Sequence, residues 1–427
     1  MEKNIKKVIN AWCSYDIANS AYNLVITSTI FPIYYHEVTQ KVISFSFPFD
    51  KILTIRNTVL YDYTIAVAYL LIIMLLPLLS GIADCGGYKK RFMRFFTLLG
   101  AISCISLYGF NANHLAIGLL GAAFAVIGFA GSLVFYNSFL PVIASPEHHD
   151  KISARGFSWG YAGSVLLLLL NLIIIFNYQS LGFSSALNAM RFAFITVGIW
   201  WIAISSFSFY YLPEEVKEKR FHLSNISKGY DEIIKVFRKV KQAPSLKWFL
   251  LAFFFLSMGV QTIMLVATMF GKEEIHLSGE SLIVTILLLQ ILGIIGATLF
   301  AKVSERKGNK ASLIIMLVMW ISICIVAFFI KTQAQFYGLA AAVGLIMGGI
   351  QSQSRSTYSK LIPATDTASY FSFYDVCEKF AIVLGMFFFG LAEHYMGNMR
   401  WSALLLSIFF IASLLIISRI SLTKKSK

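Results

Sequence analysis

Charged residues are scarce in this sequence, and their scarcity argues against a soluble globular protein. Only 13% of the 427 residues are charged, 58% are hydrophobic, and the mean hydropathy is +0.72. Soluble domains carry about 25% charged residues, and soluble monomers rarely expose large apolar patches. A chain of this composition needs lipid around most of its surface.

Signatures of ATP hydrolysis, metal binding and disulfide formation are also missing from the sequence. No Gly-x-x-x-x-Gly-Lys-Ser/Thr pattern occurs, so ATP-driven transport by this chain alone is not expected. The five cysteines are scattered and odd in number, and the pair His148-His149 has no further ligands nearby. Neither half carries a nucleophile with a base. We therefore predict no enzymatic activity, no metal and no cofactor.

Long apolar runs are abundant, and their length indicates membrane-spanning helices. A helix needs about 20 apolar residues to cross roughly 30 Å of hydrocarbon, and only helices satisfy every backbone group at that length. The first run is too long and too polar for a cleaved signal peptide, so we interpret it as a retained span. The twelve predicted spans are 10–35, 58–80, 92–110, 115–138, 156–177, 190–212, 246–270, 281–302, 311–331, 335–356, 369–393 and 400–419.

The net charge of +15 is compatible with nucleic-acid binding, but the basic residues stand at the ends of the apolar runs. With the N-terminus inside, 28 of the 36 Lys and Arg residues fall in cytoplasmic segments and seven in external ones. Cytoplasmic loops of membrane proteins show this excess. We therefore predict a multi-pass protein with both termini in the cytoplasm, a lipid bilayer around it, and no nucleic-acid partner.

The longest cytoplasmic connection, 213–245, divides the chain into a first half, 1–212, and a second half, 246–427. Apolar residues recur at helical spacing within this connection between Ile226 and Val240, and basic residues occupy the other faces. The pattern indicates an amphipathic helix that lies on the membrane surface or covers the two halves. A solvated tether is the alternative interpretation.

The loops that follow the second and the eighth predicted spans share one pattern. Residues 80–89 and 301–310 both read small residue, three residues, acid, two residues, glycine, one residue and basic residue, with Asp84 and Glu305 as the acids. A parallel repeat of six plus six helices is typical of the major facilitator fold. The predicted fold class is therefore an all-α membrane protein of twelve helices in two pseudo-symmetric six-helix bundles.

Three segments carry a resemblance to a known family. Residues 15–22 read Tyr-Asp-Ile-Ala-Asn-Ser-Ala-Tyr, and residues 348–356 read Gly-Gly-Ile-Gln-Ser-Gln-Ser-Arg-Ser. These are similar to the first-span and tenth-span motifs of the vacuole-effluxer-like family of the major facilitator superfamily, which includes amino-acid effluxers of fungal vacuoles and bacterial members. Residues 259–263 resemble its seventh span, although Ser257-Met258 stands where the family often has Asn-Asp. The resemblance implies transport of amino acids or short peptides.

Polar residues inside the predicted spans are candidates for function, because ionisable groups are costly to place in a bilayer. Asp16 is followed by Asn19 and Asn23 at i+3 and i+7, so the three side chains would share one helix face. Tyr22 lies on a neighbouring stripe. We predict that these four residues bind substrate and that Asp16 also serves in coupling or gating. A purely structural role is the alternative.

The eleventh predicted span carries the charged residues Asp375, Glu378 and Lys379, of which the first and last are spaced to form an ion pair. Two acids and one lysine leave a spare negative charge, which predicts a coupling or gating role through a carboxyl group that binds a proton. A permanent ion network is the alternative. Gln261 and Tyr374 are further substrate-binding candidates.

Gln351 and Arg355 lie one helical turn apart in the tenth predicted span. A guanidinium group there could clamp a substrate carboxylate through two hydrogen bonds or reach the inner membrane interface as an anchor. Asp84 resembles the superfamily acid that sits beside the N-terminus of span 11, where the helix dipole favours negative charge. We predict that Gln351 and Arg355 bind substrate and that Asp84 serves in gating.

The sequence thus predicts a secondary active transporter of the bacterial inner membrane that works as a monomer by alternating access. Its expected substrate is a small polar or zwitterionic solute, with an amino acid or a short peptide favoured by the resemblance. A proton gradient is the candidate energy source, and facilitated diffusion stays open. The alternatives are a non-transporting receptor or scaffold, and an exporter of drug-like or siderophore-like solutes.

Overall fold

The computed structural model describes residues 2–47, 51–214 and 224–422. Apart from one short hairpin, its regular elements are helices, because only helices pair every backbone group within one apolar segment. The elements are α1 (Lys6–Ala21), the π-helix η1 (Tyr22–Ile30), α2 (Phe31–Val38), β1 (Val42–Phe47), β2 (Lys51–Arg56), α3 (Asn57–Gly86), α4 (Lys89–Ser106), the 3₁₀ turn η2 (Leu107–Gly109), α5 (Leu115–Ser138), α6 (Leu140–Ile143), the 3₁₀ turn η3 (Pro146–His148), α7 (His149–Phe176), α8 (Ala186–Tyr211), α9 (Ser224–Gln242), α10 (Pro244–Ile275), α11 (Gly279–Phe329), α12 (Gln333–Leu361), α13 (Thr367–Met396) and α14 (Met399–Arg419).

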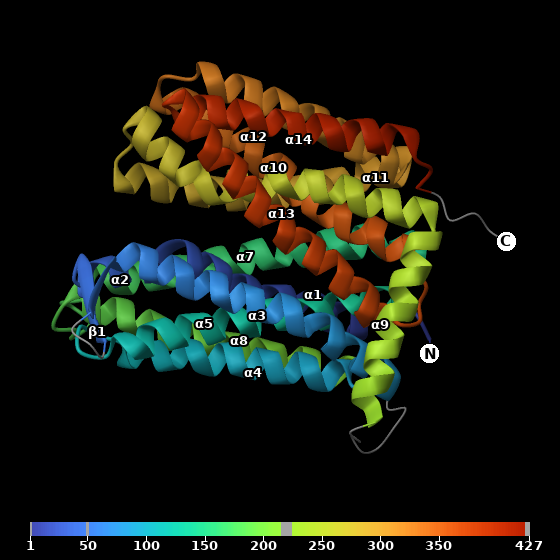
Figure 1. Ribbon diagram of the computed structural model, residues 1–427, viewed down its shortest axis with the longest axis horizontal. Coiled ribbons are helices and arrows are strands. Elements are labelled where there is room, and N and C mark those ends of the chain that lie inside the picture. The colour runs from blue at the N-terminus through green and yellow to red at the C-terminus, as the bar shows by residue number, and fades with distance from the viewer. Residues whose placement is uncertain (1, 48–50, 215–223, 423–427) are drawn as a thin grey trace.

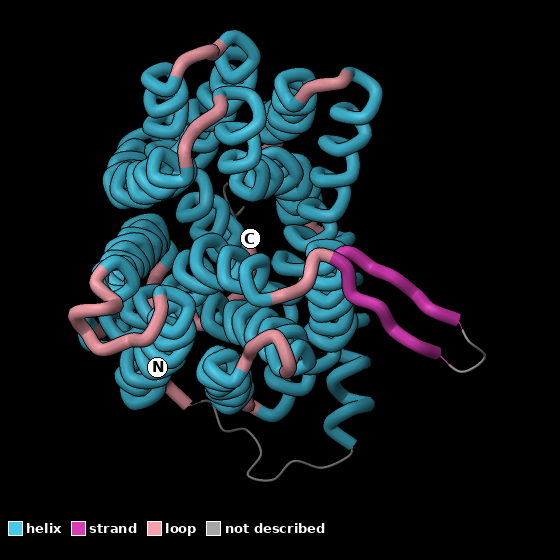
Figure 2. Tube along the Cα trace, turned by 90° about the vertical axis from the view of Figure 1, so that its left-hand side faces the viewer, coloured by secondary structure: helices cyan, strands magenta, loops and turns pink. Residues whose placement is uncertain are grey.

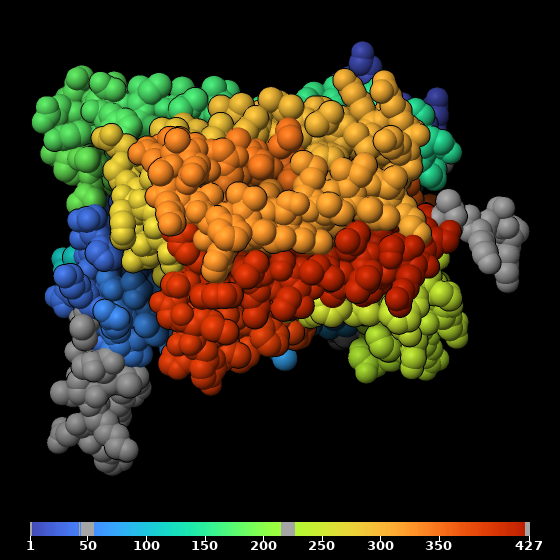
Figure 3. Space-filling model, turned by 90° about the horizontal axis from the view of Figure 1, so that it is seen from above, coloured from blue at the N-terminus to red at the C-terminus, as the bar shows by residue number. Residues whose placement is uncertain are grey.

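The long helices form two bundles that lie side by side with their axes roughly parallel (Figure 1). The N-terminal bundle contains α1 to α8 and the C-terminal bundle contains α10 to α14, which cover the face seen in Figure 3. Both termini and α9 lie at one end of the bundles, which we call the terminal side. The strands lie at the opposite end, which we call the hairpin side.

The helices account for twelve membrane spans. Among the described residues, nine helical segments are long and apolar enough to cross a membrane. One of them, α11, holds two spans, because Gly308 breaks its helical geometry with a φ of 82°. The remaining two spans are the first one, formed by α1, η1 and α2, and α13. These two carry Asp16 and Asp375, so polar residues lower their apolar character.

The connection between the first and second spans contains two strands, which the sequence analysis did not predict. It forms an antiparallel hairpin in which Val42 pairs with Arg56 and Phe47 pairs with Lys51. Figure 2 shows the hairpin projecting away from the ends of the helices. The alternating Val-Ile-Ser-Phe-Ser-Phe sequence of β1 carried this signal. A lone two-stranded hairpin is only marginally stable.

A π-helix interrupts the first span. The backbone N–H of Phe31 donates to the carbonyl of Ile26, five residues earlier, which is the spacing of a π-helix. Helical spacing predicted that Asn23 would share the face of Asp16 and Asn19, but the chain has already become a π-helix at Tyr22. Asp16 and Asn19 are buried whereas Asn23 is exposed. Asn23 therefore differs from Asp16 and Asn19 in burial, and its predicted role in substrate binding stays a prediction.

Helix α9 lies across the ends of the spans on the terminal side (Figure 1). Its Gly229 contacts the backbone of α3 so closely that a Cβ atom there would lie 2.6 Å from a side-chain carbon of Ile82. Its Val236 is fully buried, and Lys239 pairs with Asp366, just before α13, at 3.2 Å. The helix therefore bridges the two bundles.

Candidate functional site

An ion pair joins the two bundles in the terminal-side half of their interface. Asp16 comes from α1 and Arg355 from α12, and Nη2 of the arginine lies 3.2 Å from Oδ2 of the aspartate. Both residues are buried, with exposed fractions of 5% and 3%. Two charges removed from water stabilise a structure only when their remaining hydrogen-bonding groups are also satisfied. The surroundings of the pair decide whether this condition is met.

The neighbours of the pair satisfy both charged groups. Tyr136 donates its hydroxyl hydrogen to Oδ2 of Asp16 at 2.7 Å. Arg355 donates from Nε to the Ser153 hydroxyl at 2.9 Å, from Nη2 to the Ser153 carbonyl at 2.8 Å, and from Nη1 to Asn137 Oδ1 at 3.3 Å. Four of the five guanidinium N–H groups therefore have partners in this conformation. The arginine joins the bundles here, and its predicted role in binding a substrate carboxylate stays a prediction.

Aromatic rings complete the enclosure of Arg355. Its guanidinium carbon lies 4.2 Å from the centre of the Phe157 ring and 4.7 Å from that of Trp12. Planar guanidinium groups stack well on aromatic faces, and such contacts gain strength when water is excluded. The indole of Trp12 donates to the carbonyl of Tyr136 at 3.0 Å, which fixes the ring in place.

A second charged cluster lies in α13. Lys379 Nζ is 3.2 Å from Asp375 Oδ1 and 3.6 Å from Glu378 Oε2. Gln261 of α10 donates from its amide to Glu378 Oε1 at 2.7 Å. The lysine ammonium also lies 5.9 Å from the centre of the Tyr69 ring of α3, in the other bundle. The predicted ion pair is thus present, and the cluster faces the interface between the bundles.

Asp84 holds the first residues of α13 from across the interface. Its two carboxylate oxygens accept the backbone N–H groups of Ala368 at 3.2 Å and of Ser369 at 2.7 Å. The first N–H groups of a helix lack partners within the helix, and the helix dipole favours a negative charge beside them. Lys89 lies 3.3 Å from the same carboxylate and donates to Thr367 at 2.9 Å. This contact joins α3 to α13.

A second contact of this kind, centred on Asp150 at the start of α7, was missed by the sequence analysis. Its carboxylate accepts from Lys360 at 2.6 Å, Ser304 at 2.8 Å and Asn309 at 2.8 Å, all in the C-terminal bundle. Asp84 stands in the last turn of α3, whereas Asp150 stands in the first turn of α7. Glu305, the acid of the second copy of the repeated loop, is exposed.

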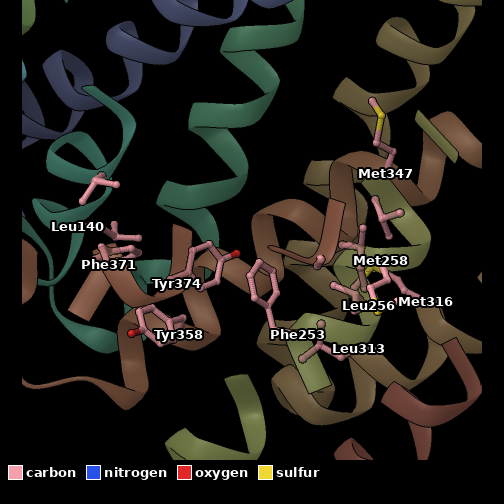
Figure 4. Close-up of a cluster of buried hydrophobic side chains, with 14 of the residues drawn as sticks. Leu140, Phe253, Leu256, Met258, Leu313, Met316, Met347, Tyr358, Phe371 and Tyr374 are labelled. Atoms are coloured by element: carbon pink, nitrogen blue, oxygen red, sulfur yellow. The ribbon is translucent and has the colours of Figure 1, made fainter. Parts of the chain in front are cut away.

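The remaining predicted site residues occupy different surroundings. Tyr22 lies inside the N-terminal bundle, where its ring stacks on Trp201 at a centroid distance of 5.4 Å. Tyr374 is buried against Phe253 at 4.0 Å in the aromatic cluster of Figure 4. Packing roles suit both tyrosines. The other predicted residues lie closer to the bundle interface: Gln351 accepts from the Tyr161 hydroxyl at 2.7 Å, and Asn19 is buried without a partner for Oδ1 among the described residues.

Comparison with known proteins identifies the family. The family model described as vacuole effluxer Atg22 like matches residues 4–427. The chain belongs to this family. An uncharacterised transporter of the major facilitator type from Bacillus subtilis, YxiO, is 29% identical over 421 residues, covering 98% of this chain and 96% of that protein. Autophagy-related protein 22 of Saccharomyces cerevisiae is 23% identical over 476 residues, covering 94% and 89%.

Solved structures show the same fold. The transporter FucP in an outward conformation aligns with a TM-score of 0.70 at 14% identity, covering 96% of this chain and 97% of that one. A bacterial homologue of the iron transporter ferroportin aligns with a TM-score of 0.68 at 12% identity, covering 97% and 98%. The predicted family and fold class are confirmed. This member of the vacuole effluxer family is a multi-pass membrane transporter, not an enzyme.

The contacts between the two bundles of this transporter concentrate on the terminal side. Among the described residues, the hydrogen bonds and ion pairs that join the bundles come from the terminal-side halves of the spans, where Asp84, Asp150 and Arg355 lie. The Ser153 hydroxyl adds a bond of 2.8 Å to the carbonyl of Ser352. The structure is therefore closed at the terminal side.

Proposed function

We propose that this transporter moves a small polar or zwitterionic solute, an amino acid or a short peptide, by alternating access between its two bundles. The observation that carries the proposal is the Asp16–Arg355 pair, because it is buried, joins the bundles and forms part of the closed terminal side. A permanent scaffold would be held more simply by apolar packing, which is often as stable as a buried ion pair. The likeness to autophagy-related effluxers supports the substrate class.

The proposed orientation places the terminal side in the cytoplasm of a bacterial cell, with the protein in the inner membrane. The excess of Lys and Arg on that side supports it, since such residues favour the cytoplasmic ends of spans. In this orientation the closed terminal side corresponds to an outward-facing conformation. Labelling of a cysteine introduced at exposed Lys151 or at exposed Lys331 tests it: an impermeant maleimide added to intact cells should react only at position 331.

The proposed energy source is a proton gradient, and the carboxyl groups of Asp375 and Glu378 are the proposed proton carriers. They share one lysine, so the cluster holds an excess negative charge at low dielectric. Uptake of protons would remove that excess. Asp16 is the second candidate of the sequence, but its carboxylate is already neutralised by Arg355.

Flux measurements in proteoliposomes test the proposed function. A panel of radiolabelled amino acids and dipeptides is added with and without a pH gradient, using wild type, Asp375→Asn and a control, Glu273→Gln, whose side chain is exposed on the hairpin side. We expect gradient-driven flux in wild type and control and no gradient-driven flux in Asp375→Asn. Correctly folded protein without flux for any solute would point to the receptor or scaffold alternative.

A further inference from the structure

One carboxylate oxygen in the charged cluster of α13 has no partner. Asp375 is buried, with an exposed fraction of 6%, and its Oδ1 contacts Lys379. Its Oδ2 makes no hydrogen bond among the described residues. A buried polar atom without a partner costs free energy, and a charged one costs more. At the interface between the bundles, this oxygen can accept a hydrogen bond from a positively charged group of a ligand.

The formal charges around this oxygen sum to minus one. Asp375 and Glu378 contribute two negative charges, Lys379 contributes one positive charge, and Gln261 is neutral. The ring of Tyr69 faces the cluster from α3. A carboxylate together with an aromatic ring suits an organic ammonium group, which donates hydrogen bonds and also gains from a ring face. A metal ion would need about six oxygen ligands instead.

The two basic groups of this interface each have an acidic partner. Arg355 donates to Asp16, Ser153 and Asn137, and Lys379 lies beside Asp375 and Glu378. Asp375 Oδ2, in contrast, has no partner among the described residues. The unmatched formal charge of this interface is therefore negative.

We propose that Asp375, with Glu378 beside it, binds the ammonium group of the substrate, so that this transporter requires a free amino group on its substrates. This inference rests on the proposed function, because it concerns the substrate class of the same interface. It places amino-acid amides and other primary amines of similar size among the ligands.

Three matched compounds test the selection by charge. Leucine is zwitterionic at pH 7, leucinamide is cationic, and N-acetylleucine is anionic with a blocked amino group. Ligands that bind only the folded protein raise its unfolding temperature. For the purified full-length protein in detergent, we expect leucine and leucinamide to raise the unfolding temperature and N-acetylleucine to leave it unchanged. Glycinamide and phenylalaninamide extend the series to smaller and larger side chains.

Two variants and one control connect the effect to the site. Asp375→Asn removes the charge with little change in shape and should abolish the shift caused by leucinamide, while Glu378→Gln should reduce it. Glu273→Gln should retain the full shift. The unfolding temperature of each variant without ligand shows whether the variant has folded. If Asp375→Asn does not fold, Glu378→Gln alone tests the site.

Stabilisation by N-acetylleucine but not by leucinamide would overturn the inference. Absence of a shift with every amine, or an equal shift in a folded Asp375→Asn variant, would overturn it too. These outcomes are distinct from failure of the proposed function. If N-acetylated compounds bind and are transported into proteoliposomes, the protein is a transporter but the proposed ammonium site is wrong. If no solute is transported, the proposed function itself is wrong.

Discussion

Gly156 of α7 lies directly against the carboxylate of Asp16 in α1. A Cβ atom at Gly156 would clash with Oδ2 of Asp16 and would lie 3.0 Å from Nη2 of Arg355. The glycine therefore gives the ion pair the space in which it forms. Gly160, one turn further along α7, packs against the same segment of α1, where its Cβ would lie 3.3 Å from the Cβ of Asp16. Small residues at this spacing let helices approach closely in membranes.

Gly156→Ala should open the terminal side. The added methyl group displaces the Asp16 carboxylate, at a cost of about 1–3 kcal/mol for overpacking, which corresponds to a change of about 5-fold to 140-fold in the ratio of closed to open molecules. Spin labels at exposed positions Lys151 and Glu305, one on each bundle, should report longer distances. Gly390→Ala is the control, because no atom lies within 4 Å of the added carbon. Equal distance distributions in both variants would contradict this role of Gly156.

Removal of one partner of the Asp16–Arg355 pair should destabilise the protein more than removal of both. Asp16→Asn leaves Arg355 buried without a counter-charge, and loss of one partner of a buried pair costs about 3–5 kcal/mol. The double variant Asp16→Asn with Arg355→Met removes the second charge and should regain part of that loss. The unfolding temperature in detergent should be highest for wild type, lower for the double variant and lowest for Asp16→Asn. A double variant that unfolds at a lower temperature than Asp16→Asn would show that the two residues are not energetically coupled.

Asp84 and Asp150 should stabilise the closed terminal side independently of each other. Asp84→Ala frees two backbone N–H groups of α13, and Asp150→Ala leaves the Lys360 ammonium without its carboxylate. Because the two contacts share no partner, their effects on the closed fraction should add. The spin-label distances at Lys151 and Glu305 measure each effect and their sum.

Lys239→Ala is the control for these two variants, because it removes an ion pair that is partly exposed. Its pair with Asp366 is partly exposed, with 40% of the lysine side chain accessible, and such pairs contribute about 0–1 kcal/mol. The variant should leave the distance distribution nearly unchanged. A shift as large as that of Asp84→Ala would mean that exposure does not determine the strength of these contacts.

Gly229→Leu should detach α9 from α3. Its added side chain meets the backbone nitrogen of Ile82, 2.9 Å from the Cβ position. We expect faster hydrogen exchange throughout α9 with little change in the exchange of the spans, because few buried contacts then hold the helix. Tyr230→Ala, at a neighbouring residue whose ring is 62% exposed, is the control and should leave the exchange rates unchanged.

Much of the architecture could be predicted from the sequence. The spans follow from the length of apolar runs, since a bilayer imposes that length on any helix that crosses it. The repeated loops at 80–89 and 301–310 indicated two related halves, and the motif at 15–22 identified the family. Asp375 and Lys379 were expected to pair because residues four apart on a helix are neighbours. These features depend on local sequence, and local sequence was sufficient for them.

The candidate site could be predicted only in part. Asp16 and Arg355 were both selected as polar residues at a similar depth in the spans, but the pairing of these two was not specified, because they lie 339 positions apart. Asp150 was overlooked because it stands at a loop boundary, where charge is ordinary. The glycine spacing in α7 carried a signal for close helix approach, but it did not identify which helix would approach.

The sequence by itself determined that this chain enters a membrane, how many times it crosses and to which family it belongs, because hydropathy and motifs act over a few residues. Only the tertiary structure decided that Arg355 forms an ion pair with Asp16 and that one carboxylate oxygen of Asp375 has no partner among the described residues. Those facts depend on how two bundles dock, and docking brings together charges whose partners no local pattern specifies.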